Sequence, residues 1–273
     1  MKASTKISVG AAVFGALALG TRRWTSARRL SRIRHELLPE KRPEVFSARM
    51  VEHFPEPVRR YFLHAIEDGT PLAGSVRLRI EGNLRPRQGA CSVEVTADEV
   101  LNPTKGFVWT AHMKMGIVPV TAADHYLNGD GAVDITAFGI FPAAHNVGPD
   151  VSRSSLHRAA AESVWVPSSL LTGAWEAIDT YHARVTVTVD GEAIPMTLTI
   201  GEDGRLREIQ MMRYGKEGVD AWQLIPYGFS VDEERMFGGY TIPSVIWGGW
   251  WYGTDDYDPD TVAGFEVLEA EFR

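Results

Sequence analysis

Apolar side chains alternate with polar ones along most of the chain after Gly74, and this period of two constrains the fold more than any other feature. Val76, Leu78 and Ile80 are separated by charged residues, which predicts a strand with one buried face. The clearest pair of alternating segments flanks Asp190-Gly191, and Asp-Gly in that setting is the strongest short-range sign of a hairpin. Strands are expected at residues 76–80, 93–97, 107–109, 118–127, 132–140, 185–189, 196–200, 206–211, 223–231, 240–242, 245–252 and 265–272.

Two segments show the helical period instead. Residues 58–66 carry an apolar stripe after prolines at 55 and 57, and Gly69 follows as a stop signal. A second helix is expected from Ser152, a good N-cap residue, to a point before Pro167. This helix interrupts the series of strands, so it is inserted within the sheet.

Together these signals predict a mainly β fold of the α+β class. About ten antiparallel strands form a large curved sheet or incomplete β-barrel, with one inserted helix and N-terminal helices. The inserted helix fills part of the concave face, and the rest is core or a ligand cavity.

The N-terminus has a different composition. Residues 7–20 are uncharged and apolar or small, and Arg22 and Arg23 follow closely. A membrane anchor is favoured, although fourteen residues are short for a bilayer of about 30 Å. A cleaved signal peptide and a weakly helical tail remain alternatives.

Residues 24–38 continue with an apolar stripe that includes Trp24, Leu30 and Ile33, surrounded by arginines. A basic amphipathic helix of this kind is attracted to anionic headgroups, so we expect residues 1–38 to contact a membrane surface. The alternative is an ordinary surface helix packed on the body. The predicted localisation is membrane-associated, with the side of the membrane open.

Charge separates the same two regions. Residues 1–42 hold ten Lys and Arg and two acids, a net charge of +8, so the remainder of a chain with net charge −7 carries −15. A body this acidic repels a phosphate backbone, which argues against nucleic-acid binding. With prolines at 39 and 43, we predict an N-terminal membrane region at 1–42 and one β-rich domain at 43–273. Deletion of residues 1–42 is expected to leave that domain folded, because the apolar stripe before it faces membrane.

Five motifs occur in one arrangement: residues 57–61, 107–109, 124–126 with Gly129 and Gly131, 158–171 with 175–176, and 240–243. Together they resemble a bacterial family of unknown function whose members have an N-terminal membrane segment and a β-rich body. The resemblance spans residues 50–272. It implies no activity and no catalytic residue. Its curved sheet is similar, as an analogy of fold, to the periplasmic lipoprotein carriers and lipid-binding lipoproteins, but no lipobox cysteine follows residues 7–20. Residues 162–171 are the most specific part of the resemblance.

Motifs for catalysis are missing from the sequence. It has no G-x-S-x-G, S-x-x-K or H-E-x-x-H motif and no phosphate-binding loop. The acidic stretch 255–260 lacks the glycine and glutamate of a calcium loop, and the single cysteine, Cys91, makes no disulfide. We therefore predict no catalytic residue, metal ligand or cofactor, and whether the chain is an enzyme stays open, with a non-enzyme favoured.

Polar residues among apolar ones give a candidate ligand site. In a cavity, a few polar anchors within an aromatic lining are typical of a small-molecule site, and the alternative is a buried network that ties helix to sheet. The proposed function is binding of a lipid or other hydrophobic molecule. The other hypotheses are an enzyme using Asp124, His125 and Glu162, and a structural protein with a self-filled core. The candidate residues are Trp109, Asp124, His125, Arg158, Glu162, Trp165, Trp175, Trp247, Trp250 and Trp251.

Overall fold

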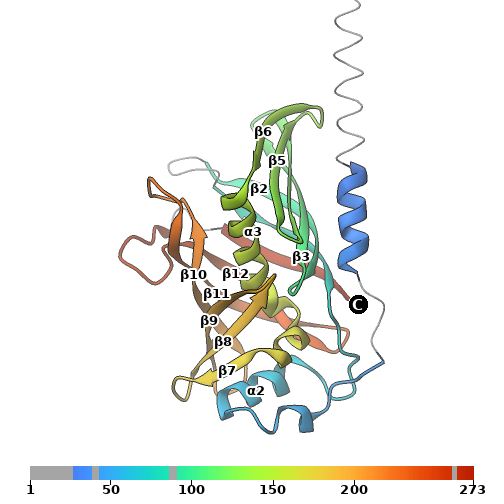
Figure 1. Ribbon diagram of the computed structural model, residues 1–273, viewed down its shortest axis with the longest axis vertical. Helices are drawn as coiled ribbons and strands as arrows, with labels where there is room; N and C mark the ends of the chain where they lie inside the picture. The colour runs from blue at the N-terminus through green and yellow to red at the C-terminus, as the bar shows by residue number, and fades with distance from the viewer. Residues whose placement is uncertain (1–26, 39–42, 86–90, 260–262) are drawn as a thin grey trace, which may run out of the picture.

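The computed structural model describes residues 27–38, 43–85, 91–259 and 263–273. Its strands form one 13-stranded antiparallel sheet that curves around a helix (Figure 1). The mainly β prediction, with a curved sheet and one inserted helix, is confirmed. The strands are β1 (Val76–Leu84), β2 (Val93–Asn102), β3 (Gly106–Met115), β4 (Val118–Leu127), β5 (Asp130–Ala137), β6 (Phe141–Val147), β7 (Ala174–Ala177), β8 (His182–Val189), β9 (Glu192–Ile200), β10 (Leu206–Gly215), β11 (Gln223–Phe237), β12 (Tyr240–Trp250) and β13 (Ala263–Phe272).

The sheet consists of two meanders joined by the first and last strands. Its order is β6-β5-β4-β3-β2-β1-β13-β12-β11-β10-β9-β8-β7. Strands that lie side by side are therefore consecutive in sequence, except β1 and β13, and the consecutive strands β6 and β7 form the two edges. Short turns make this possible. Asp190 and Gly191 both have positive φ angles, 46° and 82°, the conformation that a two-residue hairpin turn requires.

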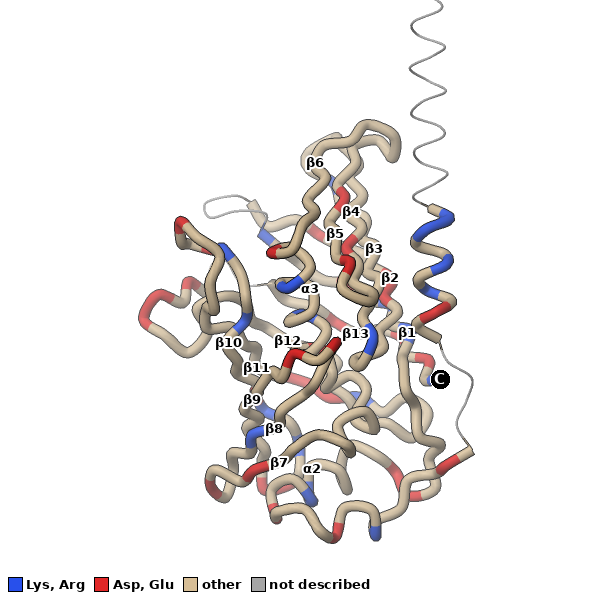
Figure 2. The backbone as a smooth tube through the Cα atoms, viewed as in Figure 1, with Lys and Arg blue, Asp and Glu red and all other residues tan. Residues whose placement is uncertain are grey.

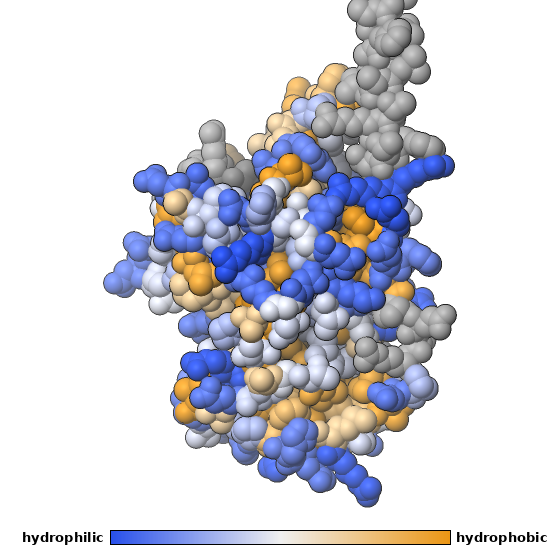
Figure 3. All heavy atoms as spheres, in the orientation of Figure 1, coloured by the Kyte–Doolittle hydropathy of each residue, from blue (hydrophilic) through white to orange (hydrophobic). Residues whose placement is uncertain are grey.

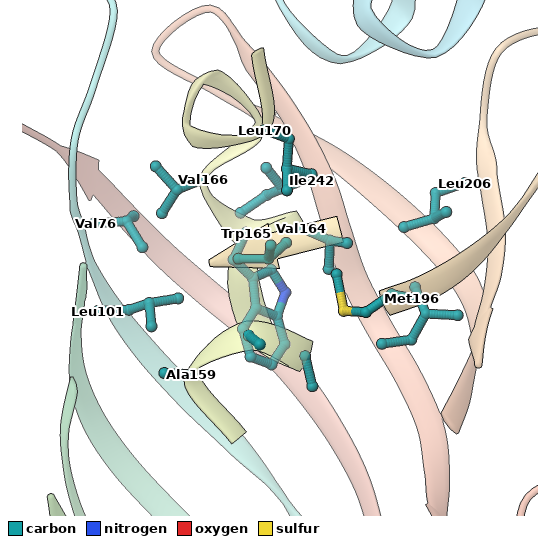
Figure 4. Close-up of a cluster of buried hydrophobic side chains, with 14 of the residues drawn as sticks. Val76, Leu101, Ala159, Val164, Trp165, Val166, Leu170, Met196, Leu206 and Ile242 are labelled. Carbon is teal, nitrogen blue, oxygen red and sulfur yellow. The ribbon is translucent and has the colours of Figure 1, made fainter. Parts of the chain in front are cut away.

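Helix α3 (Pro149–Ala161) and two 3₁₀ helices, η2 (Glu162–Trp165) and η3 (Pro167–Thr172), fill the concave face. Figure 4 shows Trp165 and Leu170 of this segment among side chains from both halves of the sheet, including Val76 and Met196. The prediction that Ser152 is the N-cap is wrong, because the helix begins earlier and Gly148 is its N-cap residue. The hydroxyl of Ser152 instead accepts a hydrogen bond from the Gly131 backbone N–H at 2.9 Å and so ties α3 to β5.

Helix α2 (Glu56–Ala65) and the 3₁₀ helix η1 (Ala48–Val51) close one end of the sheet. The predicted stripe is confirmed, since Val58, Phe62 and Ile66 are all buried. These residues cover the lower end of the concave face (Figure 1).

Three strand predictions need correction. The segment predicted as one strand at 132–140 ends at Ala137, and a turn leads into the unpredicted strand β6. The strands predicted at 240–242 and 245–252 are one strand, β12, which ends at Trp250 because Trp251 has a φ of 64°. Strand β7 was also not predicted.

Residues 27–37 form a helix on the outer face of the sheet. Ile33 and Leu37 are 3% and 0% exposed and pack against Val100 and Val108. The expectation that this stripe faces a membrane is therefore wrong for these two residues. The deletion of residues 1–42 was expected to leave the domain folded for that same reason, so that reason is wrong as well. None of the helices in the described residues is long and apolar enough to cross a bilayer. The segment 7–20 and Trp24 lie outside the described residues.

Candidate functional site

Strand register places three side chains in one row across the concave face. Glu99 on β2 pairs with Trp109 on β3, and Trp109 pairs with Asp124 on β4. Directly opposite residues of antiparallel strands point to the same side of the sheet. Each strand follows its own period of two, so the row forms without any local sequence motif.

Arg158 of α3 lies over this row and uses its guanidinium on three carboxyl groups. Its Nε donates to Glu162 at 2.7 Å, Nη1 to Asp124 at 2.7 Å and Nη2 to Glu99 at 3.2 Å. The guanidinium carbon also lies 5.1 Å from the centre of the Trp109 ring. We call Arg158, Glu99, Asp124 and Glu162 the carboxylate network.

The carboxylate network holds three acids and one guanidinium away from water. Desolvation, followed by repulsion from Glu162, raises the pKa of Glu99 well above its ordinary value. Desolvation also raises the pKa of Asp124. For Arg158, desolvation favours the neutral form, but the surrounding carboxylates outweigh it and the pKa is raised. The arginine therefore stays charged, whereas burial favours the protonated form of Glu99 and of Asp124.

A shared proton explains two oxygen atoms that otherwise lack partners. Glu99 Oε2 and Glu162 Oε2 are buried, and neither accepts a hydrogen bond from the described residues. A proton on Glu99 allows this carboxyl group to donate to Glu162, an interaction that also contributes to the raised pKa of Glu99. With one neutral acid these two oxygens have a partner, as buried polar groups require, and Asp124 Oδ1 is the buried oxygen of the network that still lacks one among the described residues.

A second arginine faces the network from the other half of the sheet. Arg213 of β10 places its guanidinium carbon 4.7 Å from the ring centres of both Tyr227 and Trp250. No hydrogen bond joins this guanidinium to another described residue, and its Nε is buried without a partner. Gly215 makes room for this stack, because a Cβ there would lie 2.3 Å from the Trp250 ring.

A cleft of about 590 Å³ lies between Arg213 and the first turns of α3. Asp124 connects the cleft to the carboxylate network, and the positive charge of Arg213 lowers the pKa of that same acid, against the larger effect of desolvation. The wall combines apolar and charged groups: Val133, Val147, Val151 and Trp222 beside Asp124 and Arg213. A cleft of this size and composition suits one small amphipathic molecule.

His125 does not belong to this site. It follows Asp124 in a strand and so points to the other face, where Val108, its partner in the register, packs beneath the helix of residues 27–37. His125 is 1% exposed, and neither ring nitrogen has a partner among the described residues. Desolvation and then Arg29 lower its pKa. Shared acid–base chemistry by Asp124, His125 and Glu162 is therefore ruled out by geometry.

The predicted tryptophans are divided among several places. Trp165 donates to the Pro243 carbonyl oxygen at 3.0 Å and stacks on Phe229, so it is core. Trp175 is also core, since it packs on Tyr61 and Phe62.

The remaining three tryptophans come from one stretch of sequence. Trp250 does not line the cleft itself but contacts Arg213, which does. Trp247 lies on the outer face, 43% exposed, against Gly264. Trp251 lies beyond β12 and donates to the Glu217 carbonyl oxygen at 3.1 Å. Ligand contact by any of the ten predicted residues stays a prediction.

Three residues of the site were missed in the sequence: Glu99, Arg213 and Trp222. A signal existed for Glu99, because the alternation of Val93, Val95 and Ala97 continues to it and places it on the buried face. Arg213 likewise continues the alternation of Ile209 and Met211. Trp222 lies in the connection between β10 and β11, where side chains do not follow the alternation of a strand, so no pattern in the sequence indicated it.

Solved structures with related architecture have very low sequence identity to this chain. One is a putative outer membrane lipoprotein-sorting protein domain from Vibrio parahaemolyticus, with 8% identity, a TM-score of 0.41 and coverage of 73% of this chain and 86% of that one. A LolA superfamily protein from Nitrosomonas europaea has 8% identity and a TM-score of 0.41, and the match covers 80% of this chain and 92% of that one. A DUF1329 family protein from Desulfovibrio piger has 9% identity and a TM-score of 0.36, and the match covers 80% of this chain and 90% of that one.

No curated protein matches the sequence. The model of one sequence family, described as a family of unknown function, matches residues 44–259, which include all thirteen strands except β13. This range contains the carboxylate network, Arg213 and the cleft. The chain therefore belongs to the family of unknown function DUF6544.

Proposed function

We propose that this chain is a membrane-attached protein that binds a lipid or other amphipathic molecule with an anionic head group in the cleft beside α3. The observation that carries the proposal is Arg213, whose guanidinium is held by two aromatic rings while its N–H groups bond to no described residue. A planar guanidinium fixed by stacking is well suited to recognise a carboxylate or a phosphate.

The rest of the cleft fits the apolar part of such a ligand. Val133, Val147, Val151 and Trp222 line the wall next to Arg213. An acyl chain against these side chains would gain about 25 cal/mol for each Å² of apolar surface removed from water. The head group would then lie at the charged end of the cleft and the chain along its apolar wall.

The carboxylate network has a supporting role in this proposal. All three nitrogens of the Arg158 guanidinium are already engaged, so Arg158 has little left for a ligand. It holds α3 on the sheet and thereby fixes one wall of the cleft. Membrane attachment through residues 1–38, membrane-associated localisation and the division at residues 42 and 43 are parts of the same proposal and rest on the composition of the N-terminus.

Ligand titration tests the proposal. The full chain is titrated with a fluorescent fatty acid and, separately, with a fluorescent phospholipid. Arg213→Gln is compared with Arg207→Gln on the same strand, where the arginine pairs with Asp203 at the surface. Charge-assisted hydrogen bonds are worth about 1.5–3 kcal/mol, so Arg213→Gln should weaken binding roughly 10- to 150-fold, and Arg207→Gln should leave it unchanged.

Native mass spectrometry gives a second measurement, the presence of a co-purified ligand. A chain that carries no ligand and takes up neither probe would contradict the proposal and favour a structural protein with a self-filled core. Equal affinities for both variants would show that Arg213 is not the anchor.

A further inference from the structure

Two neighbouring hairpins expose apolar side chains at their ends. In the turn between β3 and β4, Ile117 is 95% exposed, and in the turn between β5 and β6, Phe138 is 55% exposed. A hydrogen bond of 2.8 Å from the Phe138 N–H to the Pro119 carbonyl oxygen holds the two turns together. We call this surface the hairpin tip; its exposed apolar residues are Met115, Ile117, Phe138, Ile140 and Phe141.

The hairpin tip carries no acidic residue. Residues 115–123 and 135–144 contain no Asp, Glu, Lys or Arg, although the chain after residue 42 has a net charge of −15. Figure 2 shows the end of the β5–β6 hairpin without charged positions, and Figure 3 shows it as a hydrophobic surface. Single exposed apolar residues are ordinary, but a joined group of five, isolated from charge, indicates contact with an apolar partner.

The helix of residues 27–37 runs toward the hairpin tip. The Leu37 carbonyl oxygen accepts a hydrogen bond from Asn102 beside the turn of the β2–β3 hairpin, and Arg34 bonds Thr110 further along β3 at 2.6 Å. The first described residue, Ala27, lines an apolar groove of about 260 Å³ together with Ile140. The start of the helix therefore lies at the same end of the molecule as the hairpin tip (Figure 1).

The sequence before this helix supplies the identity of the partner. Residues 7–20 are an uncharged apolar run, Arg22 and Arg23 follow it, and Arg28 lies in the first turn of the helix. Apolar side chains next to a cluster of arginines match the two layers of an anionic bilayer, hydrocarbon and headgroups. The hairpin tip is placed where the chain enters this basic and apolar segment.

We propose that the hairpin tip inserts into the lipid bilayer surface beside the N-terminal segment, so that the body contacts the membrane at a second place. Contact at two places fixes the orientation of the body relative to the membrane, whereas attachment at a single place leaves the body free to rotate. The proposal shares membrane attachment with the proposed function but does not depend on a ligand at Arg213.

The test places a fluorescent reporter on the hairpin tip. The full chain with Cys91→Ser and Ile117→Cys is labelled with an NBD dye and reconstituted with vesicles of phosphatidylethanolamine and phosphatidylglycerol. NBD emission should increase several-fold, shift to the blue and be quenched by nitroxide-labelled lipids. The matched control is Ile178→Cys, a position 47% exposed just after β7 at the other end of the sheet, where emission should not change.

Three outcomes overturn the proposal. If the chain sediments with vesicles but NBD at position 117 stays in water, the N-terminal segment attaches the protein and the hairpin tip does not. If the full chain does not sediment with vesicles, both membrane contacts are wrong, while ligand titration still tests the cleft. If the emission at position 117 shifts with protein concentration and no lipid, the hairpin tip covers a second copy of the chain.

Discussion

Arg158 and Arg213 lie on the same concave face, and each has its guanidinium close to two aromatic rings. They differ in their hydrogen-bond partners. Arg158 donates to three carboxyl groups, whereas Arg213 donates to no described residue. The same residue type on the same surface thus has a structural role at one position and is available to a ligand at the other.

The difference follows from where the acids are. Glu99 and Asp124 come from β2 and β4, and Glu162 comes from η2 directly after α3, so every counter-charge of Arg158 lies on this side of the concave face. The half around β10 supplies aromatic rings instead. A guanidinium held by rings keeps its N–H groups directed outward, because stacking uses the face of the group and hydrogen bonds use its edge.

Removal of Arg158 should have the largest effect. Arg158→Leu leaves three buried acids without their cation and should lower the free energy of unfolding by about 3–5 kcal/mol. Urea denaturation at pH 7 measures this. The loss should decrease at acidic pH, where protonation neutralises the acids.

Two other arginine variants serve as controls for the loss of stability in Arg158→Leu. Arg153→Leu on the same helix removes an exposed pair with Glu192 and should cost no more than about 1 kcal/mol. Arg213→Leu should also cost little, because no partner loses its hydrogen bond. A loss for Arg213→Leu as large as that for Arg158→Leu would contradict the contrast between the two arginines.

Gly215→Ala tests whether stacking positions Arg213. The new Cβ would lie 2.3 Å from the Trp250 ring, so the ring must move, at a cost of about 1–3 kcal/mol for overpacking. We expect ligand affinity to fall although Arg213 itself is unchanged. Calorimetric unfolding and ligand titration together measure both effects, with Gly249→Ala, where a Cβ meets nothing within 4 Å, as the control. Unaltered affinity in Gly215→Ala would mean that the stack is not needed.

Glu99→Gln should have the smallest effect, and its sign depends on pH. Because the pKa of Glu99 is raised in the folded protein, the folded state holds a proton that the unfolded chain releases above its ordinary pKa of 4.5, so stability falls as pH rises through this window. Gln mimics the protonated acid and removes this penalty. The variant should therefore be more stable than the unmodified chain at pH 7.

Stability curves from pH 4 to pH 8 check this prediction. The difference between Glu99→Gln and the unmodified chain should disappear toward pH 4, where Glu99 is protonated in both the folded and unfolded states. Glu94→Gln, an exposed position on the same strand, serves as the control and should show no such convergence. A variant less stable than the parent at pH 7 would indicate that Glu99 is ionised in the network.

Local patterns predicted most of the strands because a strand with one buried face repeats every two residues. Asp190-Gly191 specified its hairpin, and the stripe at Val58 and Phe62 specified α2. The prediction failed at β6, whose residues are almost all exposed and so lack alternation. It also failed to place Asp124 and His125 on different faces of the sheet. Both faces of β4 are covered at this point, so both side chains are shielded from water and the pattern of burial does not distinguish them.

The sequence by itself determined the antiparallel sheet, the inserted helix, the basic N-terminus and the acidic body, since each depends on neighbours within a few residues. Only the tertiary structure decided that Glu99, Asp124 and Arg158 meet while Arg213 stays unpaired. Their association depends on strand register and on where α3 lies across the sheet. These are set by packing between residues distant in sequence, such as Trp165 with Phe229, and no local period encodes them.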